Sequence, residues 1–198
     1  MDTPGDEHLK REKYVLDEED GIMPMYEAFY IQAIIYSAGR AQDAFDRFDK
    51  SLVGPGDAAS IVATAHEAFT HVAALSRFFW PARDKALYKA RAAKLRAAFD
   101  LDETSSLHDR GLRNALEHFD ERLDEFLLQD LAGHFFPDPV VGSVSMIGSL
   151  ITFMFRLVDP AEDVFVLLGE KHSFGALRKV VADVLKRAKK MNEQGGRL

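Results

Sequence analysis

The fold is decided by residues 29–57, FYIQAIIYSAGRAQDAFDRFDKSLVGPGD. Apolar side chains recur in this stretch at intervals of three and four residues, which is the period of a helix with one buried face. Gly54-Pro55-Gly56 ends the pattern, and Asp57 is a residue type that caps the start of a helix. The stretch therefore predicts a long helix from Pro24 to about Leu52, then a turn and a second helix. The apolar positions are Phe29, Ile31, Ile34, Ile35, Ala38, Phe45, Phe48 and Leu52.

Three further segments follow towards the C-terminus with the same helical spacing. The second helix runs to Trp80 and stops at Pro81, because proline cannot continue a helix. A third helix is expected over 84–99, where alanine, lysine and arginine dominate. Residues 100–106 indicate a loop, and a fourth helix is expected to continue to about Leu131.

The pattern changes after Gly133. Residues 151–158, ITFMFRLV, and 163–168, DVFVLL, are rich in strand-forming residues and flank a turn-like interval, which predicts a β-hairpin. Helical spacing returns from Phe174 to Met191. The expected fold is mainly α, a four-helix bundle with a small C-terminal β-hairpin and a final helix. We expect a flexible acidic leader over 1–22, the bundle over 23–133, and the hairpin and last helix, packed on the bundle, over 134–198.

Composition narrows the classes of function. The 198 residues carry a formal net charge of −7, and residues 1–20 hold eight acids against three bases, so the body of the chain is close to neutral. The charge distribution therefore neither excludes nor favours a local RNA-binding site. The chain has no cysteine, which excludes disulfides, a thiolate nucleophile and cysteine-type zinc sites.

The sequence favours a cytoplasmic protein that does not enter a membrane. The N-terminus has no basic start followed by an apolar run, so no signal peptide is expected. Residues 139–155 are uncharged, but they are short for a membrane span and are interrupted by Gly142 and Gly148. Their β-branched residues favour buried strand or loop.

The fourth helix, GLRNALEHFDERLDEF at 111–126, carries the candidate chemistry. At 100° per residue its apolar positions form one stripe that faces the core, and Asn114 and His118 fall on the opposite side. These two are four residues apart, so the amide could orient the imidazole. A second copy of the helix, packed about a two-fold axis, would bring two sets of Arg113 and His118 into one cleft. The apolar stripe is Leu112, Leu116, Phe119, Leu123 and Phe126.

An ordinary solvated face explains the same residues. Arg113 and Glu117, four apart, form a common helix-surface ion pair worth only a few tenths of a kcal/mol. An arginine followed by a histidine five residues later is also a pattern that chance produces readily.

A resemblance adds weight to the catalytic interpretation. RNALEH at 113–118 resembles the Arg-polar-x3-His signature of HEPN domains, which are all-α bundles. The wider context, RFFWPA at 77–82 and SSLHDRGLRNALEHFDERLDEF at 105–126, resembles uncharacterised bacterial HEPN-like proteins. The resemblance covers roughly residues 24–132, and the segment after Gly133 matches no part of a HEPN core.

The resemblance implies a HEPN-like, metal-independent endoribonuclease that acts at a homodimer interface, often within a toxin or defence system. It places Arg113 and His118 as the catalytic pair and Asn114 at the polar position, and we take Arg110 and Glu117 as candidate substrate-binding residues. Histidine can move a proton near neutral pH, and the arginine fork can stabilise charge on phosphoryl oxygens. No cofactor is expected, and the partners would be RNA, a second copy and an antitoxin protein. The alternative is an inactive HEPN-like module that dimerises or binds a nucleotidyltransferase-type protein.

Two other residue groups offer weaker interpretations. Residues 83–96 hold six bases and one acid, which could guide an RNA backbone, although a solvated helix explains them more simply. His66, Glu67 and His71 suggest a carboxylate–histidine metal site inside the bundle. The two histidines are five residues apart rather than four, and no histidine has a glutamate three residues before it, so we expect no metal.

Overall fold

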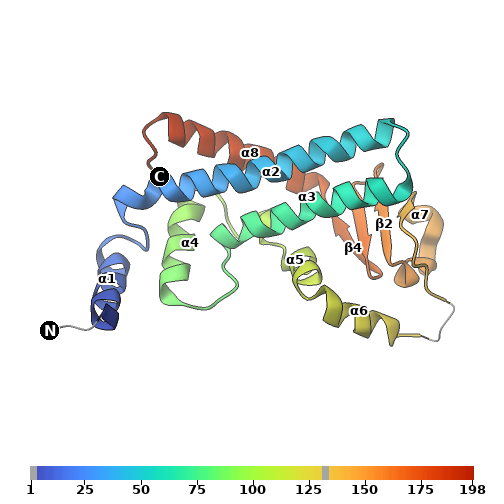
Figure 1. Cartoon of the computed structure of the whole chain (residues 1–198), viewed down its shortest axis with the longest axis horizontal. Helices are drawn as coiled ribbons and strands as arrows, with labels where there is room; N and C mark the ends of the chain where they lie inside the picture. The colour runs from blue at the N-terminus through green and yellow to red at the C-terminus, as the bar shows by residue number, and fades with distance from the viewer. Residues whose placement is uncertain (1–3, 131–133) are drawn as a thin grey trace.

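The computed structural model describes residues 4–130 and 134–198, with the side chains of Pro4, Arg110, Leu112 and Arg113 outside the description. Within these residues the chain is mainly helical, with eight α-helices and a four-stranded sheet near the C-terminus (Figure 1). None of the described helices has the length and apolar character needed to cross a membrane.

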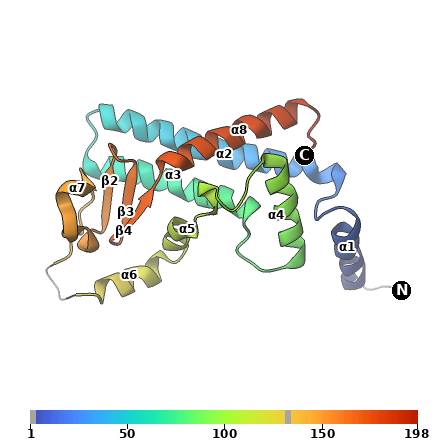
Figure 2. The same cartoon turned by 180° about the vertical axis from the view of Figure 1, so that it is seen from behind.

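The two longest helices form the centre of the molecule. Helix α2 spans Glu27–Val53 and α3 spans Ala58–Phe79, and they lie side by side in opposite directions (Figures 1 and 2). The carboxylate of Asp57 accepts a hydrogen bond of 2.7 Å from the backbone N–H of Ser60, which confirms the predicted cap. The backbone leaves helical geometry at Trp80, immediately before Pro81, as expected.

Helices α1 and α4 lie at one end of this pair. Helix α4 spans Ala86–Phe99, close to the predicted third helix, and the short 3-10 helix η1 spans Pro24–Tyr26. Within the acidic leader expected over 1–22, Pro4–Glu18 form helix α1, which the sequence did not predict. Ile22 is only 1% exposed and belongs to the main core, so the end of this segment does bury apolar surface.

The small sheet covers the N-terminal half of α3. Strands β1 (Val140–Val141), β2 (Arg156–Asp159), β3 (Val164–Leu167) and β4 (Glu170–Ser173) are hydrogen-bonded in that order. The predicted hairpin is confirmed as the antiparallel pair β2–β3, with Asp159 opposite Val164. Strand β1 pairs with β2 in parallel and β4 pairs with β3 antiparallel.

The first part of the predicted hairpin differs from the expectation. The 3-10 helix η3 (Gly148–Phe153) takes up residues 151–153, which were expected to begin the strand, and helix α7 (Val144–Ile147) precedes it. The buried carboxylate of Asp159 accepts hydrogen bonds from the backbone N–H groups of Val144, Ala161 and Glu162, at 2.8, 3.0 and 3.1 Å. One carboxylate therefore organises both α7 and the hairpin turn.

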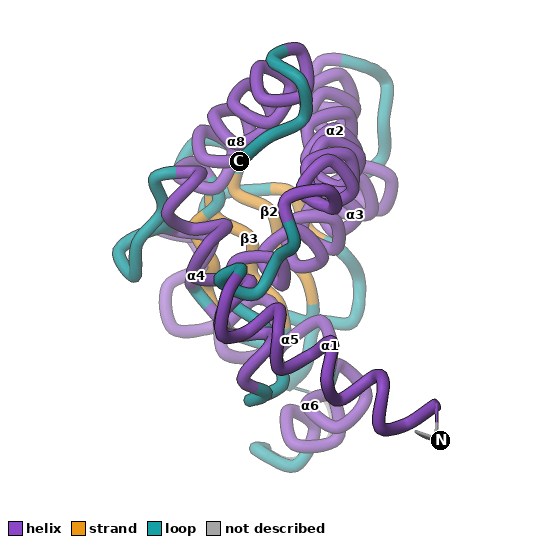
Figure 3. Tube along the Cα trace, turned by 90° about the vertical axis from the view of Figure 1, so that its left-hand side faces the viewer, coloured by secondary structure: helices purple, strands orange, loops and turns teal. Residues whose placement is uncertain are grey.

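The last helix completes the same core. Helix α8 spans Gly175–Glu193 and packs along α2 (Figures 1 and 3). Phe174 lies 5.6 Å from Phe69 and 5.8 Å from Phe48, ring centroid to ring centroid. Phe165 of β3 lies 4.8 Å from Phe69. The sheet and α8 thus share one apolar cluster with α2 and α3.

The predicted fourth bundle helix is not one helix. The chain forms the 3-10 helix η2 (Ser106–His108), then α5 (Arg110–Glu117) and α6 (Phe119–Leu127), which lie below the α2–α3 pair in Figure 1. The long neighbours of α2 are therefore α3 and α8. A continuous helix to Leu131 was a wrong prediction, and its last residue lies outside the described residues.

Candidate functional site

The candidate site lies where α5 meets α6, a region we call the α5–α6 elbow (residues 110–127). The Asp109 carboxylate accepts a hydrogen bond of 2.8 Å from the N–H of Gly111 and caps α5. The backbone at His118 has φ −114° and ψ 39°, outside helical geometry, so α5 ends there and α6 begins. His118 N–H still donates to the Asn114 carbonyl at 3.0 Å, which keeps the two helices connected.

The two arms of the elbow contact different parts of the main core. Ala115 of α5 is 1% exposed and belongs to the main core. In α6, Phe126 lies 4.9 Å from Phe135 and Phe119 lies 6.0 Å from Phe155, measured between ring centroids. The change of direction at His118 lets each arm bury its own apolar side chains. The 3.6-residue period alone does not reveal this break, since both arms keep the same spacing.

His118 is exposed at the junction of the two arms. Its side chain is 59% exposed, and Nδ1 lies 3.3 Å from Oε2 of Glu121, one turn along α6. The His118 ring therefore faces a carboxylate. The sequence had predicted that the ring would face Asn114, which is half-buried. Asn114 contributes its backbone carbonyl instead.

Glu117 takes part in an ion pair within the fold. Its Oε1 lies 2.5 Å from Nη2 of Arg77, which ties α5 to α3. This contact differs from the predicted substrate-binding role of Glu117 and from its expected pairing with Arg113, because a partner 40 residues earlier leaves no local signal in the sequence. Arg110 and Arg113 belong to α5, but their side chains lie outside the described residues.

The elbow surface is acidic on its α6 arm. Arg122 is the only base within Phe119–Leu127, and its Nη1 forms an ion pair of 2.9 Å with Glu170 of β4. A polyanion that approached His118 would therefore need cations from α5 or from another molecule. The exposed acids of α6 are Asp120, Glu121, Asp124 and Glu125.

The basic segment 83–96, which includes most of α4, faces solvent only in part. Lys94 Nζ forms an ion pair of 3.1 Å with buried Glu27, and Arg91 donates to the Arg77 carbonyl at 3.2 Å. Arg96 donates to the Phe79 carbonyl at 2.6 Å. Three of the six bases therefore hold the fold together, and the exposed ones are Arg83, Lys85 and Lys89.

The histidines of α3 do not form a metal site. His66 turns inward, 6.2 Å from the ring of Phe165, and burial together with nearby Arg156 lowers its pKa. Glu67 accepts a hydrogen bond of 2.5 Å from Arg47, which lowers the pKa of Glu67. His71 lies 3.8 Å from the Glu67 carboxylate. Within 4–130 and 134–198, no three histidine, aspartate or glutamate side chains converge as a metal site would require.

Sequence reasoning missed a buried histidine beside the elbow. His172 of β4 is 6% exposed, lies beside the first turn of α5 near Gly111, and has its pKa lowered mainly by burial. Its Nε2 and the Ser106 hydroxyl have no hydrogen-bond partner among the described residues, and both residues line a cavity of about 20 Å³. That volume holds about one water molecule. EKHS, residues 170–173, is polar throughout, so no hydrophobic alternation in the sequence signals the burial of His172.

Comparison with known proteins gives no further assignment. No protein-family model matches the chain, and neither the curated proteins nor the solved structures include a significant match.

Proposed function

We propose that the chain is a HEPN-like, metal-independent endoribonuclease whose site is the α5–α6 elbow, completed by a second copy. The observation that carries the proposal is the position of His118. The helix breaks at this residue, and its imidazole projects into solvent with a side chain 59% exposed. A phosphodiester can therefore reach the ring without any rearrangement of the core.

The chemistry needs only the RNA and this chain. His118 removes the proton from a 2′-hydroxyl, the freed oxygen attacks the adjacent phosphorus, and the bond to the 5′-oxygen breaks as that oxygen takes the proton back from the His118 imidazolium. The products are a 2′,3′-cyclic phosphate and a 5′-hydroxyl. In this proposal Arg113 stabilises the charge that develops on the phosphoryl oxygens.

The acidic surface of α6 supports a site shared by two chains. A single elbow presents His118 beside four exposed carboxylates, which repel RNA. A two-fold axis that packed the partner's α5 against α6 would bring the partner's Arg110 and Arg113 next to these carboxylates. We therefore propose that the homodimer, and not the isolated chain, is the active form.

The test is cleavage of a labelled single-stranded RNA in the presence of a metal chelator. His118→Ala should abolish cleavage, because the proton-transferring group is lost. His134→Ala is the matched control, since His134 is 61% exposed and also lies beside a carboxylate, that of Asp130, outside the elbow. An RNA with 2′-deoxy sugars should resist cleavage by the unmodified protein. Full cleavage by the His118→Ala protein would overturn the proposal.

A second candidate function follows from the ion pairs at the elbow. Glu117 is bound to Arg77, and the ring of His118 lies next to Glu121, so both polar groups already have partners within the chain. This favours an inactive HEPN-like module, which by the resemblance would dimerise or bind a nucleotidyltransferase-type protein. It predicts no cleavage by the pure protein, and a complex on size-exclusion chromatography that Glu121→Gln and Glu125→Gln weaken.

A further inference from the structure

A second site stands apart from the elbow, in a cleft of about 590 Å³ that we call the Trp80 cleft. It lies between the end of α3, helix α4 and the loop that leads to η2, and its lining includes Trp80, Lys89, Arg96, Glu103 and His108. Its volume falls within the range of small-molecule sites. The ribonuclease proposal makes no use of it.

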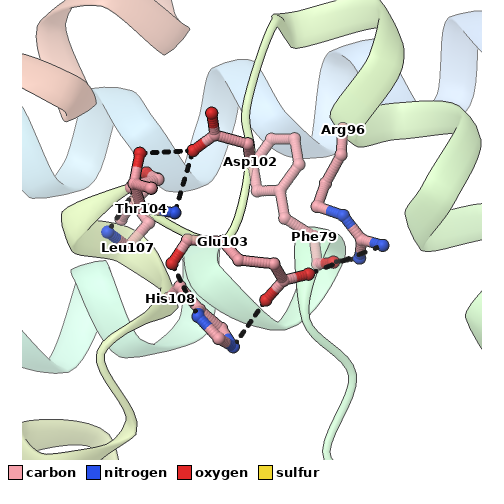
Figure 4. Close-up of polar contacts among 8 residues, drawn as sticks. Phe79, Arg96, Asp102, Glu103, Thr104, Leu107 and His108 are labelled. Atoms are coloured by element: carbon pink, nitrogen blue, oxygen red, sulfur yellow. Dashed lines mark hydrogen bonds and ion pairs between the residues drawn. The ribbon is translucent and has the colours of Figure 1, made fainter.

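Arg96 forms a rigid cation at one side of the cleft. Its Nη1 donates to the Phe79 carbonyl at 2.6 Å (Figure 4). Its guanidinium lies 5.7 Å from the centre of the Trp80 ring. The side chain is 25% exposed. Because two contacts fix the guanidinium, little conformational entropy is lost when its remaining N–H groups bind an anion.

His108 forms the second fixed group. Its ring lies 5.1 Å from that of Trp80 at an interplanar angle of 32°. Nε2 is 2.9 Å from the Glu103 carboxylate, and Nδ1 is 3.1 Å from the Glu103 carbonyl oxygen (Figure 4). Both nitrogens face acceptors, so both contacts are hydrogen bonds only when the ring is doubly protonated.

The carboxylate of Glu103 lies between these two groups. It is 2.9 Å from His108 and 4.0 Å from Nη2 of Arg96, and Figure 4 shows it bridging them. Its side chain is nevertheless 64% exposed and belongs to a surface loop. Exposed ion pairs contribute little free energy, so a stronger anion can replace this carboxylate.

Further cations stand at the rim. Lys89 is paired with Asp84, but both side chains are mostly exposed, at 65% and 78%. Arg83 is exposed and also lines the cleft. If Glu103 turns into solvent, the cleft presents Arg96, His108, Arg83 and Lys89 against the single acid Asp84.

We propose that the Trp80 cleft binds a phosphate group, either free phosphate or the phosphate of a small sugar ester. The phosphate takes the position of the Glu103 carboxylate between Arg96 and His108, and Lys89 and Arg83 contact it from the rim. A phosphate dianion can accept hydrogen bonds from the arginine fork and the imidazolium together, which a single carboxylate at 4.0 Å from Arg96 does not achieve. Glu103 is therefore an internal competitor for the site.

The chain provides its own reporter for this site. Trp80 is its one tryptophan, so intrinsic fluorescence reports directly on the floor of the cleft. We expect a saturable change in Trp80 fluorescence on titration with inorganic phosphate or ribose 5-phosphate. Ribose and sodium chloride at equal ionic strength should leave the signal unchanged. Tighter binding of ribose 5-phosphate would identify a sugar ester as the ligand, and equal binding would identify the free ion.

Glu103→Gln is the decisive variant, because a gain of affinity cannot result from misfolding. Loss of the competing charge should tighten phosphate binding about fivefold. Arg96→Lys should weaken it about tenfold, because lysine lacks the two-pronged donor geometry. Glu162→Gln, an exposed change in the turn between β2 and β3, is the matched control and should have no effect. The proposal is overturned if sodium chloride reproduces the fluorescence change, or if Glu103→Gln leaves the affinity unchanged.

Discussion

Glu27 of α2 and Lys94 of α4 form an ion pair of 3.1 Å between Oε1 and Nζ, with side chains only 6% and 21% exposed. Lys94 Nζ also donates to the carbonyls of Glu19 and Ile22, at 3.2 and 2.9 Å. The other Glu27 oxygen accepts the N–H of Leu198 at 3.0 Å. This one pair therefore joins α2, α4, the segment after α1 and the C-terminus.

Removal of one member of this pair should be costly. In Glu27→Gln the Lys94 ammonium stays buried without its counter-charge, so we expect a loss of about 3 kcal/mol in the free energy of unfolding. Urea denaturation followed by circular dichroism measures it. Glu7→Gln, which breaks the exposed pair with Arg11, should change stability by less than about 0.5 kcal/mol. Equal effects of the two variants would contradict this interpretation.

Gly21 should not tolerate a side chain. Its φ is +85°, and a Cβ there would lie 2.7 Å from the backbone carbon of Ala90, which leaves no room against α4. Gly21→Ala should therefore destabilise the protein by about 2 kcal/mol or more, and should loosen α1.

Gly39→Ala is the matched control for this prediction. Gly39 lies within α2, its φ is not positive, and a Cβ there would meet nothing within 4 Å. Alanine should stabilise the protein by about 0.5–1 kcal/mol, because it favours the helix. Thermal unfolding of both variants gives the opposite signs expected, and hydrogen exchange in α1 shows whether it is released.

His172 should make stability depend on pH. Burial lowers its pKa below the ordinary value of 6.5, so the folded protein holds the ring neutral while the unfolded chain takes up a proton. Stability is complete above about pH 6.5 and falls as the pH drops towards the lower folded pKa. Urea denaturation at a series of pH values should show a smaller loss for His172→Gln. The same loss in this variant as in the unmodified protein would exclude His172 as a cause, and the exposed His134→Gln is its control.

Phe174 should couple the C-terminal region to the central helices. Its ring is 1% exposed and lies against Phe48 and Phe69, so Phe174→Ala removes contacts shared by α2, α3 and α8. We expect a loss of about 4 kcal/mol. Trp80 fluorescence and far-ultraviolet circular dichroism should report the same shifted transition. Two separate transitions would instead mean that residues 134–198 unfold independently.

Much of the fold was predictable where the signal was local. The turn after α2, the cap of Asp57 and the stop at Pro81 depend on residues within four positions of each other. The β2–β3 hairpin was predictable for the same reason. Strand β1 was not, because its two residues become a strand only by pairing with Leu157 and Val158.

The helical placement of the candidate residues was predictable from the sequence, but their contacts were not. Residues 113–117 of RNALEH lie on α5, as the helical pattern indicated, and His118 follows its last residue. The break at His118 escaped prediction because it depends on where Phe119 and Phe126 find aromatic partners, on segments far along the chain. The ion pair of Glu117 with Arg77 also escaped prediction, because Arg77 lies on a helix far from Glu117 in the sequence.

The sequence by itself determined the helical character, most helix ends and the hairpin, because caps, prolines and apolar spacing act between near neighbours. Only the tertiary structure decided which bases of α4 face inward, that α8 packs on α2, and that Arg96, Glu103 and His108 meet over Trp80. These contacts depend on how apolar faces from distant segments fit together, and no single segment determines the free energy of that packing.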